Sequence, residues 1–251
     1  MAPEVGALEQ VLVVIPARYG SSRFPGKALA DLAGKPLIVR VAERAARMRT
    51  AGRVVVATDD ARIRDAVTAA GFACELTAEH PTGTDRVGEI ARRDPAPIVL
   101  NLQGDEPLLD PADADGLVRA LCADPAADLA TLAHPLADAA EWRDPHAVKV
   151  LLDRQGRALY FSRAPLPGAF PGRAARGERL ALRHVGIYAF RRAALLRFLE
   201  LPRTPLEEAE GLEQLRALEH GLRIRVERTE RRAVGVDTPA DLERVRALWA
   251  D

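Results

Sequence analysis

The sequence predicts an α/β fold whose doubly wound first half carries a mixed-sheet insert, and three observations support this. A run of β-branched residues at 11–15 ends at Pro16, as expected of a strand buried on both faces. Strand-like and helix-like segments then alternate as far as residue 123, which favours a parallel sheet covered by helices. With 251 residues, 48% of them hydrophobic, the chain is long enough to bury a full core.

Each element of the first half has a local signal. Pro36 is typical of a helix start, and Gly71 is typical of a helix end. Apolar runs of β-branched residues predict further strands, and helical spacing of apolar residues predicts the segments between them. The expected strands are 11–15, 54–58, 72–76 and 97–103, and the expected helices are 36–49, 60–71, 84–93 and 111–123.

The second half changes character, because strand-like segments follow one another closely. The turn at 154–156 predicts a hairpin between its flanking strands. Residues 164–180 are dense in Pro and Gly and predict a loop. No linker is long enough to separate independent domains, so we expect a single unit. The expected strands are 128–136, 147–153, 157–163 and 182–190, and helices are expected at 191–200 and 206–220; the chain then closes with a strand, a turn at 235–239 and a helix at 239–250.

Composition excludes several classes of function. The 36 Lys and Arg balance the 36 Asp and Glu, which argues against a nucleic-acid binder. Apolar runs of five to six residues are far short of the roughly 20 needed to cross a bilayer, so no membrane association is expected. The acidic N-terminal segment does not resemble a signal peptide and predicts a cytoplasmic protein. Cys74 and Cys122 are isolated, which favours buried free thiols.

The segment from Pro16 to Lys27 predicts a phosphate-binding loop directly after the first strand. Its glycines and serines let backbone amides approach an anion, and Arg18, Arg23 and Lys27 supply positive charge. Only three of the 36 basic residues are lysines, so Lys27 stands out, whereas we expect Lys35 and Lys149 to be structural. The loop is not a Walker A motif, and it lacks the GxGxxG of a nicotinamide-dependent oxidoreductase. A solvated surface loop is the alternative.

Two aspartates are candidate metal ligands at strand ends. Asp105 follows an apolar strand, and Asp237 lies in the turn at 235–239. Ligands of open α/β sheets bind at the carboxyl edge of the strands, and Mg²⁺ typically uses one or two protein carboxylates beside phosphate oxygens and water. Alternatively either aspartate caps a helix, Asp237 most obviously because Pro239 follows it.

Seven segments together resemble the CMP-Kdo synthetase family, the 3-deoxy-manno-octulosonate (Kdo) cytidylyltransferases. The resemblance runs in order from about residue 11 to 248, and it implies a Rossmann-like nucleotide-diphospho-sugar transferase fold and a homodimer. The implied reaction joins CTP to Kdo and gives CMP-Kdo and pyrophosphate for lipopolysaccharide biosynthesis. The segments are PARYGSSRFPGKAL, HPTGTDR, NLQGDEP, LYFSRAPLP, RHVGIYAF, PLEEAEGLEQLR and GVDTPADLERVRA.

The resemblance also implies roles for individual residues. The nucleotide would be bound by Ala17, Arg18, Arg23, Lys27, Thr82, Gly83 and Arg86, with Arg18, Lys27 and Asp105 catalytic and Asp105 and Asp237 as metal ligands. The sugar would be bound by Gln103, Arg163, His184, Tyr188, Glu213 and Gln214, with Arg163 facing the sugar carboxylate. Ala28 and Thr82 depart from the family's common Pro and Ser. Residues about 11–125 and 221–251 would form the nucleotide-binding core, and residues about 126–220 the sugar-binding and dimerisation part.

Without the resemblance, the sugar-site residues have structural alternatives. His184 and Tyr188 are four residues apart on an expected strand and could satisfy each other in the core. Glu213 and Gln214 could be solvated helix surface.

The expected mechanism is in-line attack of the sugar's anomeric hydroxyl on the α-phosphorus of CTP. Positioning and charge stabilisation dominate such transfers, and we identify no general base. Two Mg²⁺ ions are expected in the ternary complex, the second one between the sugar carboxylate and the α-phosphate. The alternatives are a cytidylyltransferase for 8-amino-Kdo or a nonulosonic acid, and a non-catalytic nucleotide-binding homologue.

Overall fold

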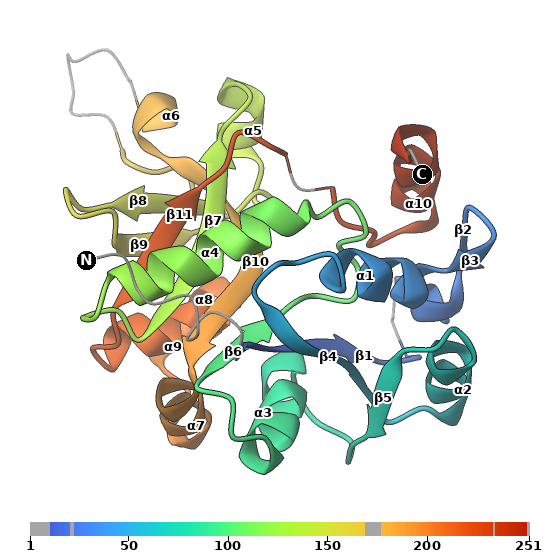
Figure 1. Cartoon of the computed structure of the whole chain (residues 1–251). Helices are drawn as coiled ribbons and strands as arrows, with labels where there is room; N and C mark the ends of the chain where they lie inside the picture. The colour runs from blue at the N-terminus through green and yellow to red at the C-terminus, as the bar shows by residue number, and fades with distance from the viewer. Residues whose placement is uncertain (1–10, 21–22, 169–176, 233, 250–251) are drawn as a thin grey trace.

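The computed structural model describes residues 11–20, 23–168, 177–232 and 234–249. Within these residues nine strands form one mixed sheet, ordered β11-β7-β10-β6-β1-β4-β5, and β8 extends it by pairing with β10 and β9 (Figure 1). The strands are β1 (Val11–Ala17), β4 (Ala51–Thr58), β5 (Ala73–Leu76), β6 (Ile98–Asn101), β7 (Leu129–Pro135), β8 (Lys149–Leu152), β9 (Ala158–Ser162), β10 (Leu182–Arg191) and β11 (Ile224–Arg228).

The first half is the parallel part of this sheet, as predicted. β1 pairs in parallel with both β4 and β6, so that Val13 lies beside Val54 on one side and Leu100 on the other. β5 continues the parallel order beside β4. The helices that connect these strands are α1 (Leu37–Ala45), α2 (Ala61–Ala69), α3 (Gly83–Arg93) and α4 (Pro111–Ala123).

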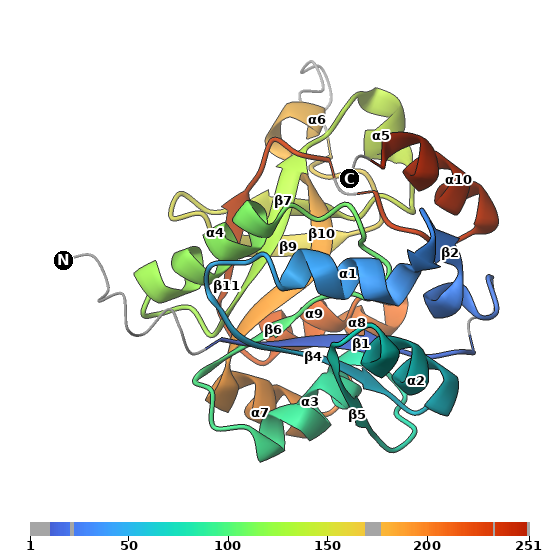
Figure 2. The same cartoon turned by 45° about the vertical axis from the view of Figure 1, so that its right-hand side comes forward.

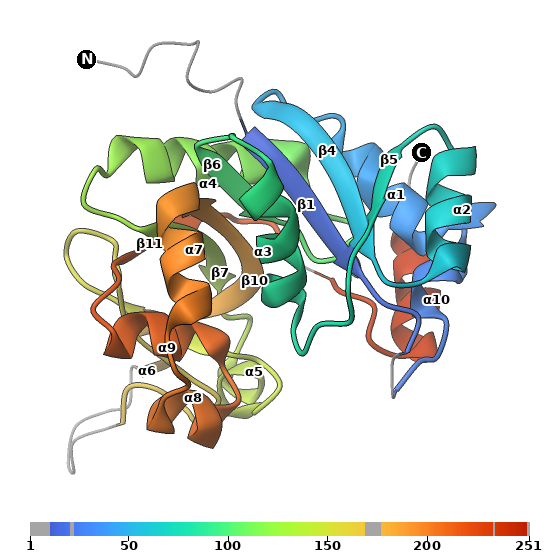
Figure 3. The same cartoon turned by 90° about the horizontal axis from the view of Figure 1, so that it is seen from below.

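Helices cover both faces of the sheet, as the buried strands require. Side chains of α1, α2 and α4 pack on one face with Val13 and Ile15, whereas those of α3 and α7 (Arg192–Glu200) pack on the other face with Leu12 and Val14. α1 and α4 lie along one face in Figure 2, and α3 and α7 lie side by side in Figure 3. The alternation along β1 explains why a continuous apolar run forms this strand: both of its faces are core.

The second half confirms the mixed sheet and the hairpin. β10 is antiparallel to β6 and β7, and β8 and β9 form the antiparallel hairpin expected around residues 154–156. β11 pairs in parallel with β7 at the edge of the sheet opposite β5. The strand at 224–228 thus lies beside the second half of the chain, although the division into nucleotide and sugar parts stays a prediction.

Several segments differ from the sequence prediction. The first helix ends at Ala45 rather than at residue 49, and the last helix, α10 (Pro239–Leu248), ends two residues early. Residues 169–176 of the expected loop lie outside the described residues, but its end forms the short helix α6 (Gly177–Leu180). The expected helix 206–220 is wrong: α8 (Pro205–Glu210) ends at Gly211, whose φ of 61° lies in the left-handed region, and α9 (Glu213–Glu219) starts anew. Short elements that the sequence did not reveal are η2 (Lys27–Leu29), β2 (Asp31–Leu32), β3 (Lys35–Pro36) and α5 (Ala139–Arg143).

Two of the structural expectations are confirmed. Cys74 and Cys122 are free, partly buried thiols packed against the core. Lys35 pairs with Glu43, while Lys149 is fully buried. Across the described ranges, no helix combines the length and apolar character that a membrane span requires.

Candidate active site

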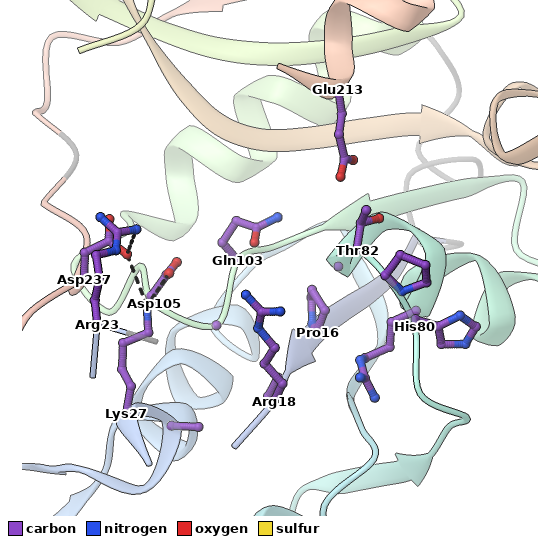
Figure 4. Close-up of a pocket in the computed structure, with 16 residues that line it drawn as sticks. Pro16, Arg18, Arg23, Lys27, His80, Thr82, Gln103, Asp105, Glu213 and Asp237 are labelled. Atoms are coloured by element: carbon purple, nitrogen blue, oxygen red, sulfur yellow. Dashed lines mark hydrogen bonds and ion pairs between the residues drawn. The ribbon is translucent and has the colours of Figure 1, made fainter. Parts of the chain in front are cut away.

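A cavity of about 420 Å³ opens at the carboxyl ends of β1 and β6 (Figure 4). This is the edge at which parallel α/β sheets bind ligands. Every residue predicted to bind nucleotide or metal lines it, together with two of the predicted sugar-site residues. The lining comprises Ala17, Arg18, Arg23, Lys27, Thr82, Gly83, Arg86, Asp105 and Asp237, with Gln103 and Glu213, and also Pro16, Ala28, His80, Pro81 and Gly104.

The loop after β1 is folded so that Lys27 projects into the cavity. Gly26 donates its N–H to the carbonyl of Tyr19 (3.0 Å) and has a φ of 74°, and a Cβ at this position would lie 3.3 Å from the Tyr19 ring. The backbone conformation therefore favours glycine here, and a side chain would also crowd the Tyr19 ring. Lys27 follows at the start of η2, and its side chain is 16% exposed. Arg18 lies in the same loop, lines the cavity and is exposed to solvent.

Asp105 and Asp237 converge on Lys27, although 132 residues separate them in the sequence. The Lys27 ammonium lies 2.7 Å from Asp105 Oδ2 and 3.4 Å from Asp237 Oδ1, and Arg23 pairs with Asp237 at 3.2 Å. The N–H of Val236 donates to the carbonyl of Asp105 (2.9 Å), which joins the C-terminal turn to the end of β6. The loop after β6 and the turn before α10 are thus held together by backbone as well as by charge, and Asp237 lies in that turn rather than at the end of a strand, because β11 ends at Arg228.

Neither aspartate caps a helix, so that alternative is excluded. Thr238 is the N-cap of α10 and forms a reciprocal capping box with Asp241, which leaves the carboxylate of Asp237 directed at Lys27 and Arg23. The N-cap of α4 is Asp110, not Asp105.

The carboxylate pair fits a Mg²⁺ ion. Both side chains present oxygens to the same cationic centre, which is the arrangement a hard divalent cation needs. Within the described residues no three His, Cys, Asp or Glu side chains gather into a metal-binding group. Two carboxylates completed by phosphate and water are characteristic of Mg²⁺ rather than of a structural metal with an all-protein ligand set.

Glycine is required beside this pair as well. A Cβ on Gly104 would lie 2.9 Å from the carbonyl oxygen of Pro16, so a larger residue would push the end of β6 away from β1. Glu106, two residues after Gly104, is partly buried, and desolvation, reinforced by the nearby Asp105 carboxylate, raises its pKa to about 8.

The start of α3 forms another part of the wall. Thr82 caps this helix by accepting the N–H of Asp85 (3.1 Å), and Gly83 is its first residue. Arg86 is only 4% exposed and donates to Asp59 (2.6 Å) and to Thr77 (2.5 Å). Its charge is therefore paired within the protein while its side chain lines the cavity.

A second cavity of about 370 Å³ adjoins the first. Both cavities share Gly83, Gln103, Asp105 and Glu213, so a ligand in one lies against the same wall as a ligand in the other. Figure 4 shows Glu213 entering from the wall opposite Arg18 and Lys27. The predicted sugar-site residues His184, Tyr188 and Gln214 line this second cavity.

His184 is neutral, because burial lowers its pKa to about 3. The Thr131 hydroxyl lies 2.9 Å from Nε2 of His184 and 2.8 Å from the carbonyl of Ile187. Because a carbonyl oxygen can only accept, we assign the hydroxyl proton of Thr131 to its bond with Ile187. With this assignment, Nε2 of His184 donates to the Thr131 oxygen and Nδ1 is left as an acceptor. Burial likewise raises the pKa of Tyr188 and keeps the phenol protonated. The two rings lie 5.5 Å apart and share a face of β10, but their polar atoms do not pair with each other.

Gln214 is only 6% exposed, so it is not helix surface. Its side-chain nitrogen is buried, and the described part of the protein offers it no hydrogen-bond partner. A buried amide without a partner costs free energy unless a ligand or water satisfies it. The amide therefore suits a polar ligand in the second cavity.

Arg163 is placed differently from the other predicted sugar-site residues. It lines neither cavity, and its guanidinium donates to backbone carbonyls, at 2.7 Å to Glu210 and at 3.1 Å to Pro145. Its contact with a sugar carboxylate stays an untested prediction.

With this geometry established, comparison with known proteins identifies the family. The family described as cytidylyltransferase matches residues 12–224. The chain belongs to the cytidylyltransferase family. Among individual cytidylyltransferases, it is 55% identical to the 3-deoxy-manno-octulosonate cytidylyltransferase of Anaeromyxobacter sp., over 97% of this chain and 98% of that protein. It is 51% identical to the protein of the same name from Syntrophotalea carbinolica, over 94% and 97%.

A solved structure agrees with the sequence comparison. The structure of CMP:2-keto-3-deoxy-manno-octonic acid synthetase complexed with CTP superposes with a TM-score of 0.89 at 46% identity, covering 95% of this chain and 98% of that chain. The resemblance to the CMP-Kdo synthetase family and the predicted nucleotide-diphospho-sugar transferase fold are therefore confirmed.

Sequence reasoning missed several residues of this cytidylyltransferase site. Thr84 donates its hydroxyl to Glu213 Oε2 at 2.7 Å and thereby bridges the start of α3 and the start of α9. It lies inside the quoted HPTGTDR segment, but no local pattern distinguishes a threonine that reaches across a cavity. Arg183 and His146 also line the second cavity. Arg183 is next to His184, and a cation adjacent to a predicted sugar residue was the available signal.

Proposed function

We propose that this chain transfers the cytidylyl group of CTP to Kdo and produces CMP-Kdo and pyrophosphate, a step of lipopolysaccharide biosynthesis. One observation carries the proposal: a cation-rich cavity of nucleotide size and a polar cavity of sugar size share a wall that contains Asp105. A ligand in each would bring a phosphate and a hydroxyl together at that wall.

The chemistry asks for positioning and for charge compensation. The anomeric oxygen of the sugar attacks the α-phosphorus, the bond from this phosphorus to the bridging oxygen of pyrophosphate breaks, and the hydroxyl proton is released to solvent. Lys27, Arg18 and Arg23 bind the triphosphate and compensate the charge that develops on the leaving pyrophosphate. Ala17, Thr82, Gly83 and Arg86 shape the wall against which the nucleotide rests.

Asp105 and Asp237 are the proposed ligands of Mg²⁺. When bound, Mg²⁺ supplies charge neutralisation at the triphosphate and at the reacting oxygens. Lys27 already lies between both carboxylates, so it keeps them converged before the substrates arrive. Positioning of this kind reduces the reorganisation that the reaction requires.

Gln103, His184, Tyr188, Glu213 and Gln214 are the proposed sugar-binding residues. They offer both acceptors and donors to sugar hydroxyls: the carboxylate of Glu213, the neutral ring of His184 and the unpaired amide of Gln214. The acid group of the sugar needs a cation, and Arg183, whose Nη1 also pairs with Glu141 (2.5 Å), brings a guanidinium to the lining of this cavity.

The test is release of pyrophosphate from CTP in the presence of Mg²⁺. Kdo, 8-amino-Kdo and N-acetylneuraminate are each supplied in turn beside a blank without sugar. Release with Kdo alone is the expected result. Pyrophosphate release with only one of the other sugars would identify that sugar, rather than Kdo, as the substrate. Binding of CTP without any release of pyrophosphate would indicate a non-catalytic homologue.

A further inference from the structure

A buried polar network joins the end of β9 to the turn between α8 and α9. Lys149 is its centre: the side chain has no exposed surface, lines neither cavity and is unused by the proposed mechanism. Its ammonium donates to the carbonyl of Asp144 (2.8 Å) and to the carbonyl of Arg163. A buried lysine is costly unless its donors are satisfied, and these carbonyls satisfy two of its three N–H donors.

Arg163 continues the network. Its Nε donates to the carbonyl of Glu210 (2.7 Å), Nη1 to that of Pro145 (3.1 Å) and Nη2 to that of Gly211 (3.5 Å). All three nitrogens of the guanidinium thus bind main-chain oxygens. If the side chain turned toward a sugar, the carbonyl of Glu210, whose contact is partly buried, would lose its donor, whereas the contacts with Pro145 and Gly211 are exposed to water.

Glu210 closes the network from the other side. Its carboxylate accepts the backbone N–H of Arg163 (2.8 Å) and the hydroxyl of Ser162 (2.5 Å). Arg163 and Glu210 therefore bind each other's main chain in both directions. Hydrogen bonds to charged groups are the stronger class, so this contact resists opening.

The turn held in this way sets the direction of α9. Gly211 has a left-handed backbone, and α9 begins two residues later at Glu213, followed by Gln214. A change in the backbone of residues 210–212 would rotate the first turn of α9, and with it both sugar-site side chains. Glu213 itself lies across the first cavity from Arg18 and Lys27 of the nucleotide loop (Figure 4).

We propose that Lys149, Arg163 and Glu210 are positioning residues that fix the α8–α9 turn so that Glu213 and Gln214 face the sugar cavity. This inference rests on the proposed function and deepens it. It assigns Arg163 an action through Glu210 and Gly211.

The kinetic test compares Glu210→Gln, Arg163→Lys and the double variant, with Glu208→Gln as an exposed control on the same helix. Each single variant weakens the hydrogen bonds between Arg163 and Glu210. We therefore expect KM for Kdo to rise about 5- to 30-fold while KM for CTP changes less than about twofold. The double variant should be no worse than the more affected single variant, because coupled residues are not additive. Multiplied effects in the double variant, or an equal rise in both KM values, would overturn the proposal.

A second measurement does not depend on activity. Hydrogen–deuterium exchange of residues 205–216, without substrates, should be faster in Glu210→Gln and in Lys149→Met than in the wild type or in Glu208→Gln. Unchanged exchange in a folded Glu210→Gln protein would refute the proposed positioning of the α8–α9 turn, even if the wild type used another sugar. Wild-type protein that shows protected exchange but releases no pyrophosphate would instead refute the proposed function alone.

Discussion

Replacing Thr84 with valine tests whether the two cavities act as one site. Thr84 is 9% exposed, and its hydroxyl donates to Glu213 across the boundary between the cavities. It also accepts from Asn101 (3.4 Å), which in turn accepts from the amide of Gln103 (3.2 Å). Valine keeps the shape of threonine but removes the hydroxyl, so two sugar-site residues lose a shared support.

The size of the effect follows from these contacts. A hydrogen bond to a charged group contributes about 1.5–3 kcal/mol when it is buried. Glu213 is partly exposed, so water replaces some of the lost bond and about 1–2 kcal/mol remains. This corresponds to a loss of about 5- to 30-fold in kcat/KM for Kdo.

The assay is steady-state release of pyrophosphate with one substrate varied at a time. We expect Thr84→Val to lower kcat/KM for Kdo while KM for CTP stays within about twofold, and Thr84→Ser, which keeps the hydroxyl, to retain most of the activity. A valine variant as active as the wild type with Kdo would show that the contact has no role. Equal losses for CTP and Kdo would mean that the substitution disturbs α3 as a whole.

Further predictions concern the metal site, His184 and a buried ion pair. Asp105→Asn and Asp237→Asn should each lower kcat by at least about 100-fold at ordinary Mg²⁺, and a chelator should abolish wild-type turnover; near-normal rates in both variants would discard the metal assignment. His184 has a folded-state pKa of about 3 against about 6.5 when unfolded, so the unfolded chain binds the extra proton between these values. Stability should therefore fall as pH drops below about 6.5, and urea denaturation should give a shallower pH dependence for His184→Gln. Glu207→Ala should cost about 3 kcal/mol in the same urea assay, because it leaves the buried Arg216, which Glu207 Oε2 contacts at 2.8 Å, without its partner; a loss under about 1 kcal/mol would contradict this.

Residues close together in the sequence were sufficient to predict most of the framework. The β-branched run at 11–15 specifies a buried strand, and helix α4 has the predicted bounds because Asp110 caps it and Pro111 starts it. The loop with Lys27 and the aspartate after β6 were predicted by residue type and by their place at strand ends. These signals act within one turn or one strand, so the sequence displays them directly.

The tertiary structure alone decided which of these residues meet. The sequence pattern continues helically through Gly211, yet α8 ends at Glu210 and Gly211 adopts a left-handed turn, beside the contact of Glu210 with the backbone N–H of Arg163. Thr84 and Glu213 are 129 residues apart, and Arg163 and Glu210 are 47 apart. No local propensity carries information about such pairs, because their distance depends on how the whole sheet packs. The sequence therefore determined the elements and the chemistry of the strand ends, and packing determined which side chains face a ligand and which support the others.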